Sequence, residues 1–260
     1  MMSDNTPPEY LKNLNILSGR PKLEAINKQI LDAGTIQEYA NGYHNLYKLI
    51  EGTDPTFTLA ISAHHDVVRQ NADNCLDNTA SCYNLINLCN KLINAKPRYN
   101  ILCAWTDAEE TCNIDLCGVN HLPIQYDYLL DLELTSCGHI WVVKHYNDKL
   151  DKVRDLFEGA LELSMPYNNA VAAMLKNLNK GSTCLTLMRE GDIEEVRKHY
   201  FCKRWGQCHA ETDTYDNWFS RQETTLFVDK LFSRLTGLPL PTLTSPRELG
   251  LDELDDRNKA

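Results

Sequence analysis

The stretch "FTLAISAHHD", residues 57–66, indicates both the fold and the position of its candidate functional residues. Residues 57–63 are apolar, small or β-branched, which is typical of a buried strand. The strand then runs directly into His64, His65 and Asp66, where a soluble sheet usually has a turn. His64 and Asp66 lie two residues apart and share one face of the strand, whereas His65 points to the other. This strand end is either a polar edge in solvent or one corner of a metal site.

Strands and helices alternate along the rest of the chain. Further strands are expected at 98–106, 126–135, 139–146 and 182–190, and helices at 79–95, 149–163, 167–178, 191–199 and 215–236. The strand at 139–146 is expected to form a hairpin with the one before it. This alternation of apolar strands with helices predicts an α/β fold, with a mostly parallel mixed sheet sandwiched by helices.

One domain is expected over residues 1–236. Its first 35 residues predict two short helices, around 9–18 and 22–33, and extended segments follow at 36–40 and 45–52. Residues 237–260 are rich in proline and acidic residues, which predicts a loosely held tail and not a second domain.

Charge and composition exclude several classes of function. The net charge of -10 and the lack of a Lys/Arg cluster argue against nucleic-acid binding. No apolar run approaches the ~20 residues of a membrane span, and no secretory signal is evident, so a soluble cytoplasmic protein is expected. Its ten cysteines are then expected to be thiols. Cys75, Cys82 and Cys89 recur every seven residues, as a buried helical stripe would.

Metal-binding residue types follow several of the predicted strands. Parallel α/β sheets place their sites beyond the carboxyl ends of the strands. The candidate residues there are His64, Asp66, Asp77, Glu109, Glu110, Asp131, Glu133, His209 and Asp213. Each alone has an ordinary explanation, such as a helix cap or a solvated loop. Together they predict a zinc pair, because imidazoles and carboxylates bind Zn²⁺ and a neighbouring Glu can act as a base.

The order H-x-D, D-N, D-x-E-E, L-D-L and H-x-x-x-D-T resembles the M28 family of zinc peptidases across residues 57–235. That family includes leucyl-type bacterial aminopeptidases and glutaminyl cyclases. The resemblance implies a zinc-dependent exopeptidase-like fold with two zinc ions. His64, Asp77 and Asp131 would hold one zinc, while Asp77, Glu110 and His209 would hold the other, so that Asp77 bridges them.

The resemblance also implies roles for the remaining residues. Glu109 would be the general base, and Asp66 would accept a hydrogen bond from the His64 ring. Asp213 is a candidate for the same role toward His209. Glu133 is a rival to Asp131, because both lie on one face of their strand; the sequence "LLDL" favours Asp131.

Three further expectations come with the family. The peptide bond between Asp77 and Asn78 is expected to be cis. Residues 166–174 and 181–187 resemble the stretch that closes the family's substrate pocket. The chain also departs from the family, with Ala108 where a glycine is usual and Ala210 where a threonine is usual.

The expected function is metal-dependent amide hydrolysis of the aminopeptidase type, acting on a peptide or a small acylated amine. One alternative is a glutaminyl cyclase-like acyltransferase, for which one zinc suffices. Another is a non-catalytic binding module with the same fold. His65, which points away from the metals, is expected to be replaceable, and the oligomeric state stays open.

Overall fold

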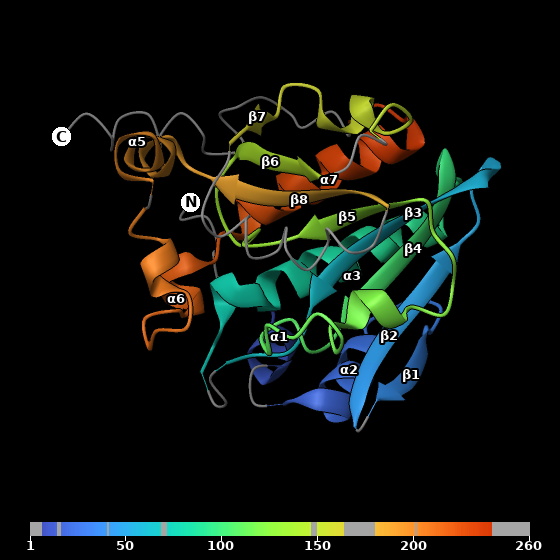
Figure 1. The fold of residues 1–260 in the computed structure, drawn as a ribbon, viewed down its shortest axis with the longest axis horizontal. Helices are drawn as coiled ribbons and strands as arrows, with labels where there is room; N and C mark the ends of the chain where they lie inside the picture. Colours follow the sequence, from blue (N-terminus) through green and yellow to red (C-terminus); the bar gives the residue numbers. More distant parts are fainter. Residues whose placement is uncertain are drawn as a thin grey trace.

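A computed structural model describes residues 7–14, 17–40, 42–68, 72–146, 150–163, 180–200 and 202–240. Within them lies one eight-stranded mixed sheet in the order β1-β2-β4-β3-β5-β8-β6-β7 (Figure 1). The strands are β1 (Thr35–Ala40), β2 (Tyr43–Ile50), β3 (Asp54–His64), β4 (Tyr99–Thr106), β5 (Tyr128–Leu132), β6 (Ile140–Tyr146), β7 (Leu161–Glu162) and β8 (Gly181–Met188). The four central strands β4, β3, β5 and β8 are parallel, so the predicted α/β class with a mixed sheet is confirmed.

Most of the helices pack on one face of this sheet. The α-helices are α1 (Glu9–Leu14), α2 (Gly19–Asn27), α3 (Ala80–Ile93), α5 (Glu190–His199), α6 (Tyr215–Trp218) and α7 (Arg221–Thr236). Short helical turns are η1 (Cys75–Thr79), η2 (Gly118–His121), η3 (Arg154–Phe157) and η4 (Trp205–Gln207). Side chains of α1, α2, α3 and α7 share one apolar core with strand residues such as Ile61, Trp105 and Leu130. Because these strand side chains point to one face, their neighbours must point to the other.

The opposite face of the sheet carries a smaller apolar cluster. Ala60, Leu102 and Leu129 pack there against Val119 and Leu122, which lie in and just after η2. Residues of β3 at even positions point to this face, and they end in a histidine. The titratable residue at the end of β3 therefore lies on the face that carries the smaller cluster.

Two predicted elements differ from the structure. The described part of 149–163 contains only η3 and β7 in place of an α-helix. The helix expected at 215–236 is divided into α6 and α7, because Phe219 and Ser220 are extended. The Ser220 side chain accepts a hydrogen bond from the backbone N–H of Glu223 and so caps α7.

One predicted pairing also differs. β6 pairs antiparallel with β8, and not with the preceding strand β5. The helix expected at 167–178 lies outside the described residues. Residues 241–260 of the predicted tail also lie outside them.

The cysteines are all free thiols, and all except Cys112 and Cys208 are buried. Cys75, Cys82 and Cys89 are fully buried in the main core, which confirms their predicted packing role. In the described residues, no helix combines the length and apolar character that crossing a membrane requires.

Replacing Ile61 by alanine is expected to lower the free energy of unfolding by about 2–5 kcal/mol, because this fully buried residue of β3 would leave a cavity. Leu31→Ala is the control, since Leu31 is 67% exposed and its loss should change stability by less than ~0.5 kcal/mol. Urea denaturation measures both. Equal losses in the two variants would contradict this assignment of the core.

Candidate metal centre

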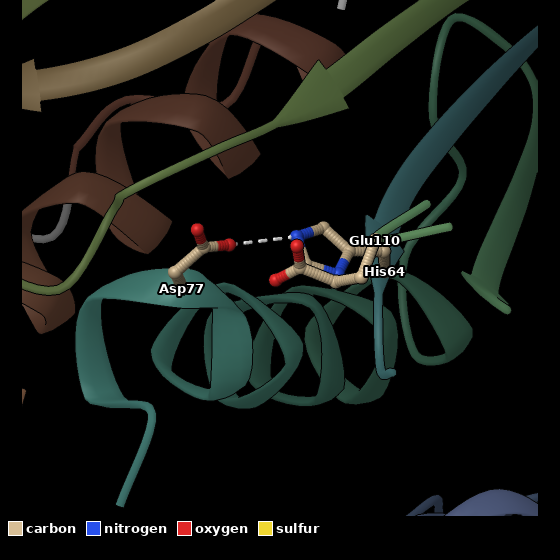
Figure 2. Close-up of side chains that lie close together, drawn as sticks. All are labelled: His64, Asp77 and Glu110. Carbon is tan, nitrogen blue, oxygen red and sulfur yellow. Dashed lines mark hydrogen bonds and ion pairs between the residues drawn. The ribbon is translucent and has the colours of Figure 1, made fainter. Parts of the chain in front are cut away.

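The predicted site residues meet at the carboxyl edge of the parallel strands. His64 is the last residue of β3, and the loop after β4 carries Glu109 and Glu110. Asp77 lies in η1, directly before α3, and His209 follows η4. Figure 2 shows His64, Asp77 and Glu110 pointing toward one another from these separate elements. Each of the three offers a ligand atom, and these atoms lie within 4.8 Å of one another.

The Asp77 carboxylate lies between two imidazole rings. Its Oδ1 is 2.9 Å from His64 Nε2, and its Oδ2 is 2.9 Å from His209 Nε2. Glu110 Oε1 lies 3.2 Å from the same His209 nitrogen. One carboxylate therefore faces both histidines, with a different oxygen toward each.

Glu133, and not the expected Asp131, lies beside His64. Glu133 is fully buried, and its Oε2 is 3.5 Å from His64 Nε2. Asp131 Oδ1 instead accepts a hydrogen bond from Ser62 Oγ at 2.5 Å. The parallel register explains the difference, because Ser62 pairs with Asp131 and the next residue on the same face of each strand is His64 or Glu133.

Asp66 lies next to His64, as expected. His64 Nδ1 is 3.2 Å from the Asp66 carbonyl oxygen and 3.4 Å from its Oδ1. The second carboxylate oxygen, Oδ2, accepts a hydrogen bond from the backbone N–H of Glu110 at 2.9 Å. Asp66 thus connects the end of β3 to the loop that follows β4.

Asp213 has a different partner from the one expected. Its carboxylate accepts hydrogen bonds from the backbone N–H groups of Leu76, at 2.6 Å, and Asp77, at 3.4 Å. Burial raises the pKa of this carboxyl to about 7. Asp213 therefore supports the turn that carries Asp77, whereas its predicted service was to His209.

The backbone around the cluster is unusual at several points. The peptide bond between Asp77 and Asn78 is cis, as the family resemblance implied. Ala108 has a φ of 63° and His209 a φ of 64°. This left-handed region favours glycine, which gives a physical reason for the glycine that the family usually has at the position of Ala108.

Buried carboxylates crowd the cluster. Burial raises the pKa of Glu109 to about 8, and the pKa values of Glu110 and Glu133 are also raised chiefly by burial. Neighbouring carboxylates such as Asp77 add to the effect at Glu109 and Glu110. The negative charge that these groups can carry is therefore confined to a site that water screens poorly.

The two histidines respond to that charge. Hydrogen bonds with Asp77 and Glu110 raise the pKa of His209 to about 10. Burial would lower the pKa of His64, but the Glu133 and Glu109 carboxylates outweigh it and raise this pKa well above its ordinary value. A positive charge is thus stabilised at this position, and a divalent cation would supply it.

The donor set fits zinc. Imidazole nitrogens and carboxylate oxygens are established zinc ligands, and this site offers both types within a few ångströms. The two oxygens of Asp77, each facing one histidine, are what two neighbouring ions would need from a shared ligand.

His65 points away from this cluster, as predicted, but it is not exposed. It is buried, and its Nε2 lies 3.1 Å from the His44 carbonyl oxygen and 3.8 Å from Asp107 Oδ2. Replacing it would disturb this packing even though it faces no metal, so the expectation that it is replaceable does not match its surroundings.

Lys22 is a buried charge that sequence reasoning missed. It lies in α2, is 1% exposed, and its Nζ is 3.5 Å from Thr79 Oγ1 at the start of α3. Burial lowers its pKa, and the carboxylates of Asp66 and Asp107 act in the opposite direction. A lysine in a short amphipathic helix resembles a surface residue, so the sequence carried no signal of this position.

The fold is that of zinc-dependent exopeptidases, as comparison with solved structures shows. A zinc aminopeptidase from Bacillus subtilis matches with 14% identity and a TM-score of 0.55, over 74% of this chain and 49% of its own. A Zn-dependent exopeptidase from Parabacteroides distasonis matches with 13% identity and a TM-score of 0.62, over 88% and 96%. A glutaminyl cyclase from Tannerella forsythia matches with 11% identity and a TM-score of 0.59, over 88% and 97%. The chain spans about half the length of the Bacillus enzyme.

Sequence comparison leads to one family. Residues 45–128 match peptidase family M28, and this segment contains His64, Asp77 and Glu110. No curated protein matches the chain. Over residues 45–128, the resemblance to the M28 zinc peptidases that the motifs indicated is therefore confirmed.

Adding zinc to the metal-free protein is expected to raise its melting temperature, because an ion that binds only the folded state stabilises it by about 2.7 kcal/mol at 100 times its Kd. Asp77→Asn and His209→Ala are expected to reduce or abolish this shift. Asp229→Asn is the control, since Asp229 pairs with Lys91 and not with the cluster. An unchanged zinc shift in both cluster variants would contradict the assignment of these ligands.

Proposed function

We propose that this chain is a zinc-dependent amide hydrolase of the aminopeptidase type, acting on a peptide or a small acylated amine. The observation that carries the proposal is the Asp77 carboxylate, which faces His64 Nε2 with one oxygen and His209 Nε2 with the other. Glu110 at 3.2 Å from His209 adds a further donor on that side. The match of residues 45–128 to an M28 peptidase family supports the same class of reaction.

The proposed ligands form two sets that share Asp77. His64, Asp77 and Glu133 would hold the first zinc, because Glu133 lies closer to the His64 ring than the hydrogen-bonded Asp131 does. Asp77, Glu110 and His209 would hold the second. Asp131 would then have a supporting role, in which it accepts the hydrogen bond of the Ser62 hydroxyl, two residues before His64.

Glu109 is the proposed general base. Zinc, when bound, supplies Lewis acidity that makes a water more acidic and polarises the scissile carbonyl. Glu109 Oε2 lies 3.9 Å from His64 Nε2, and its side chain is 17% exposed, so it borders the metal centre and can still reach a water. The carboxylate would take a proton from the attacking water and return it to the nitrogen of the leaving amine.

Glutaminyl cyclisation is the second candidate. The likeness in fold to the Tannerella glutaminyl cyclase, over 97% of that chain, favours it. In that reaction the amine of the substrate itself attacks, so no water is consumed. A peptide with an N-terminal glutamine distinguishes the two, because a hydrolase would release free glutamine whereas a cyclase would release ammonia and leave a cyclised peptide.

Glu109→Gln is expected to lower kcat by about 10²–10⁴-fold, because the amide cannot accept the proton of the attacking water. Metal analysis should show unchanged zinc content, since this residue is not a proposed ligand. Glu24→Gln on the exposed side of α2 is the control and should retain full activity. The measurement is steady-state hydrolysis of a panel of aminoacyl and acyl-amine substrates. Zinc-loaded wild type that hydrolyses none of them, or unchanged turnover in Glu109→Gln, would favour a non-catalytic module.

Glu133→Gln and Asp131→Asn form a matched pair that tests the choice of ligand. Glu133→Gln should lose zinc on dialysis, because the amide that replaces a charged ligand binds zinc poorly. Asp131→Asn should keep its zinc, since the amide oxygen can still accept the Ser62 hydrogen bond. Metal analysis after dialysis checks both variants. Loss of zinc from Asp131→Asn alone would restore Asp131 as the ligand.

A further inference from the structure

The loop that carries Glu109 and Glu110 is closed at its base. It leaves β4 at Asp107 and returns at Gly118, the first residue of η2. The backbone N–H of Gly118 donates to the Asp107 carbonyl oxygen at 2.8 Å, which joins the two ends. It is therefore a compact loop whose two ends lie close together.

Asn45 of β2 joins the same two ends through its side chain. Its Oδ1 accepts a hydrogen bond from the backbone N–H of Asp107 at 3.2 Å, and its Nδ2 donates to the Gly118 carbonyl oxygen at 2.8 Å. Asn45 is fully buried, so water cannot substitute for either bond. The fit is close, since a Cβ at Gly118 would lie 2.3 Å from Asn45 Oδ1.

Neighbouring residues of the β1–β2 hairpin hold the loop in the same place. Tyr39 Oη donates to the Leu116 carbonyl oxygen at 2.8 Å, and its ring stacks on that of His121 with centroids 4.5 Å apart. The backbone N–H of His44 donates to Asp107 Oδ2 at 3.0 Å. The loop is therefore fastened to the antiparallel edge of the sheet on one side, while it supplies Glu109 and Glu110 to the metal centre on the other.

We propose that Asn45 is a positioning residue that holds the 107–118 loop so that Glu109 and Glu110 reach the metal centre. The role rests on the proposed function, in which these two glutamates are the base and a zinc ligand. The amide of Asn45 fits both tasks, because its oxygen accepts from one backbone group while its nitrogen donates to the other. Aspartate would lack the donor, and alanine would leave two buried backbone groups unpaired.

Asn45→Ala tests the proposal, with Asn90→Ala as the matched control. Asn90 also bridges two backbone groups, as its Oδ1 accepts from Leu31 N–H and its Nδ2 donates to the Gln29 carbonyl oxygen, both at 2.8 Å. It holds the turn after α2, outside the metal centre. Asn45→Ala is expected to lower kcat and zinc affinity about 10–100-fold, the usual effect of losing support behind a metal ligand. Asn90→Ala should lower the melting temperature without either change.

Amide hydrogen exchange measures the loop directly and does not depend on activity. Amides within residues 108–117 should exchange faster in Asn45→Ala than in wild type, while those of α3 exchange as before. If Asn45→Ala does not fold, Tyr39→Phe removes the hydroxyl that donates to the Leu116 and Asp107 carbonyl oxygens and keeps the ring. It should shift exchange, kcat and zinc affinity in the same direction to a smaller extent.

Two results would overturn the proposal, and they are distinguishable. Asn45→Ala with kcat and zinc affinity within twofold of Asn90→Ala, and with unchanged exchange of the loop amides, would show that Asn45 does not position the glutamates. A wild-type protein that neither binds zinc nor hydrolyses amides would overturn the function on which the role rests. Hydrogen exchange would in that case still report whether Asn45 holds the loop.

Discussion

The parallel pairing of β3 with β4 and β5 is the constraint on which the rest of the site depends. It places the carboxyl ends of three strands at one edge of the sheet, with His64 opposite Thr106 of β4. The polar residues that follow each of these strands must then lie close to one another. The other face of the same strands packs against α1, α2, α3 and α7, and this apolar core supports the edge of the sheet. Side chains carried by such a support are held more precisely than side chains on free loops.

That arrangement brings several carboxylates and two imidazole rings close together. Asp77, Glu109, Glu110 and Glu133 converge on the rings of His64 and His209, and most of these groups are buried. Burial raises the pKa values of Glu109 and Glu133, while the neighbouring carboxylates raise the pKa values of His64 and His209. The same crowding of carboxylates would favour a divalent ion among these groups.

The edge strands contribute to the site although they carry none of the proposed ligands. β1 and β2 are antiparallel additions to the parallel centre, and Asn45 and Tyr39 use them to hold the base of the 107–118 loop. Asp213 plays a comparable part behind Asp77, through the backbone of η1. In both cases a residue distant in sequence fixes the backbone that presents a ligand, and not the ligand itself.

The sequence by itself determined the α/β fold and most of the cluster, because apolar strands that end in titratable residues are a local pattern and parallel strands share an edge. It placed Asp131 and Glu133 on one face of a strand and favoured Asp131, whereas the folded chain brings Glu133 beside His64. The register of β5 against β3 decides which is level with His64, and register is a tertiary property. The partners of Asn45 lie 62 and 73 residues away, and those of Asp213 lie 136 and 137 residues away, so no local pattern could reveal them. Only the folded chain brings such residues within hydrogen-bonding distance.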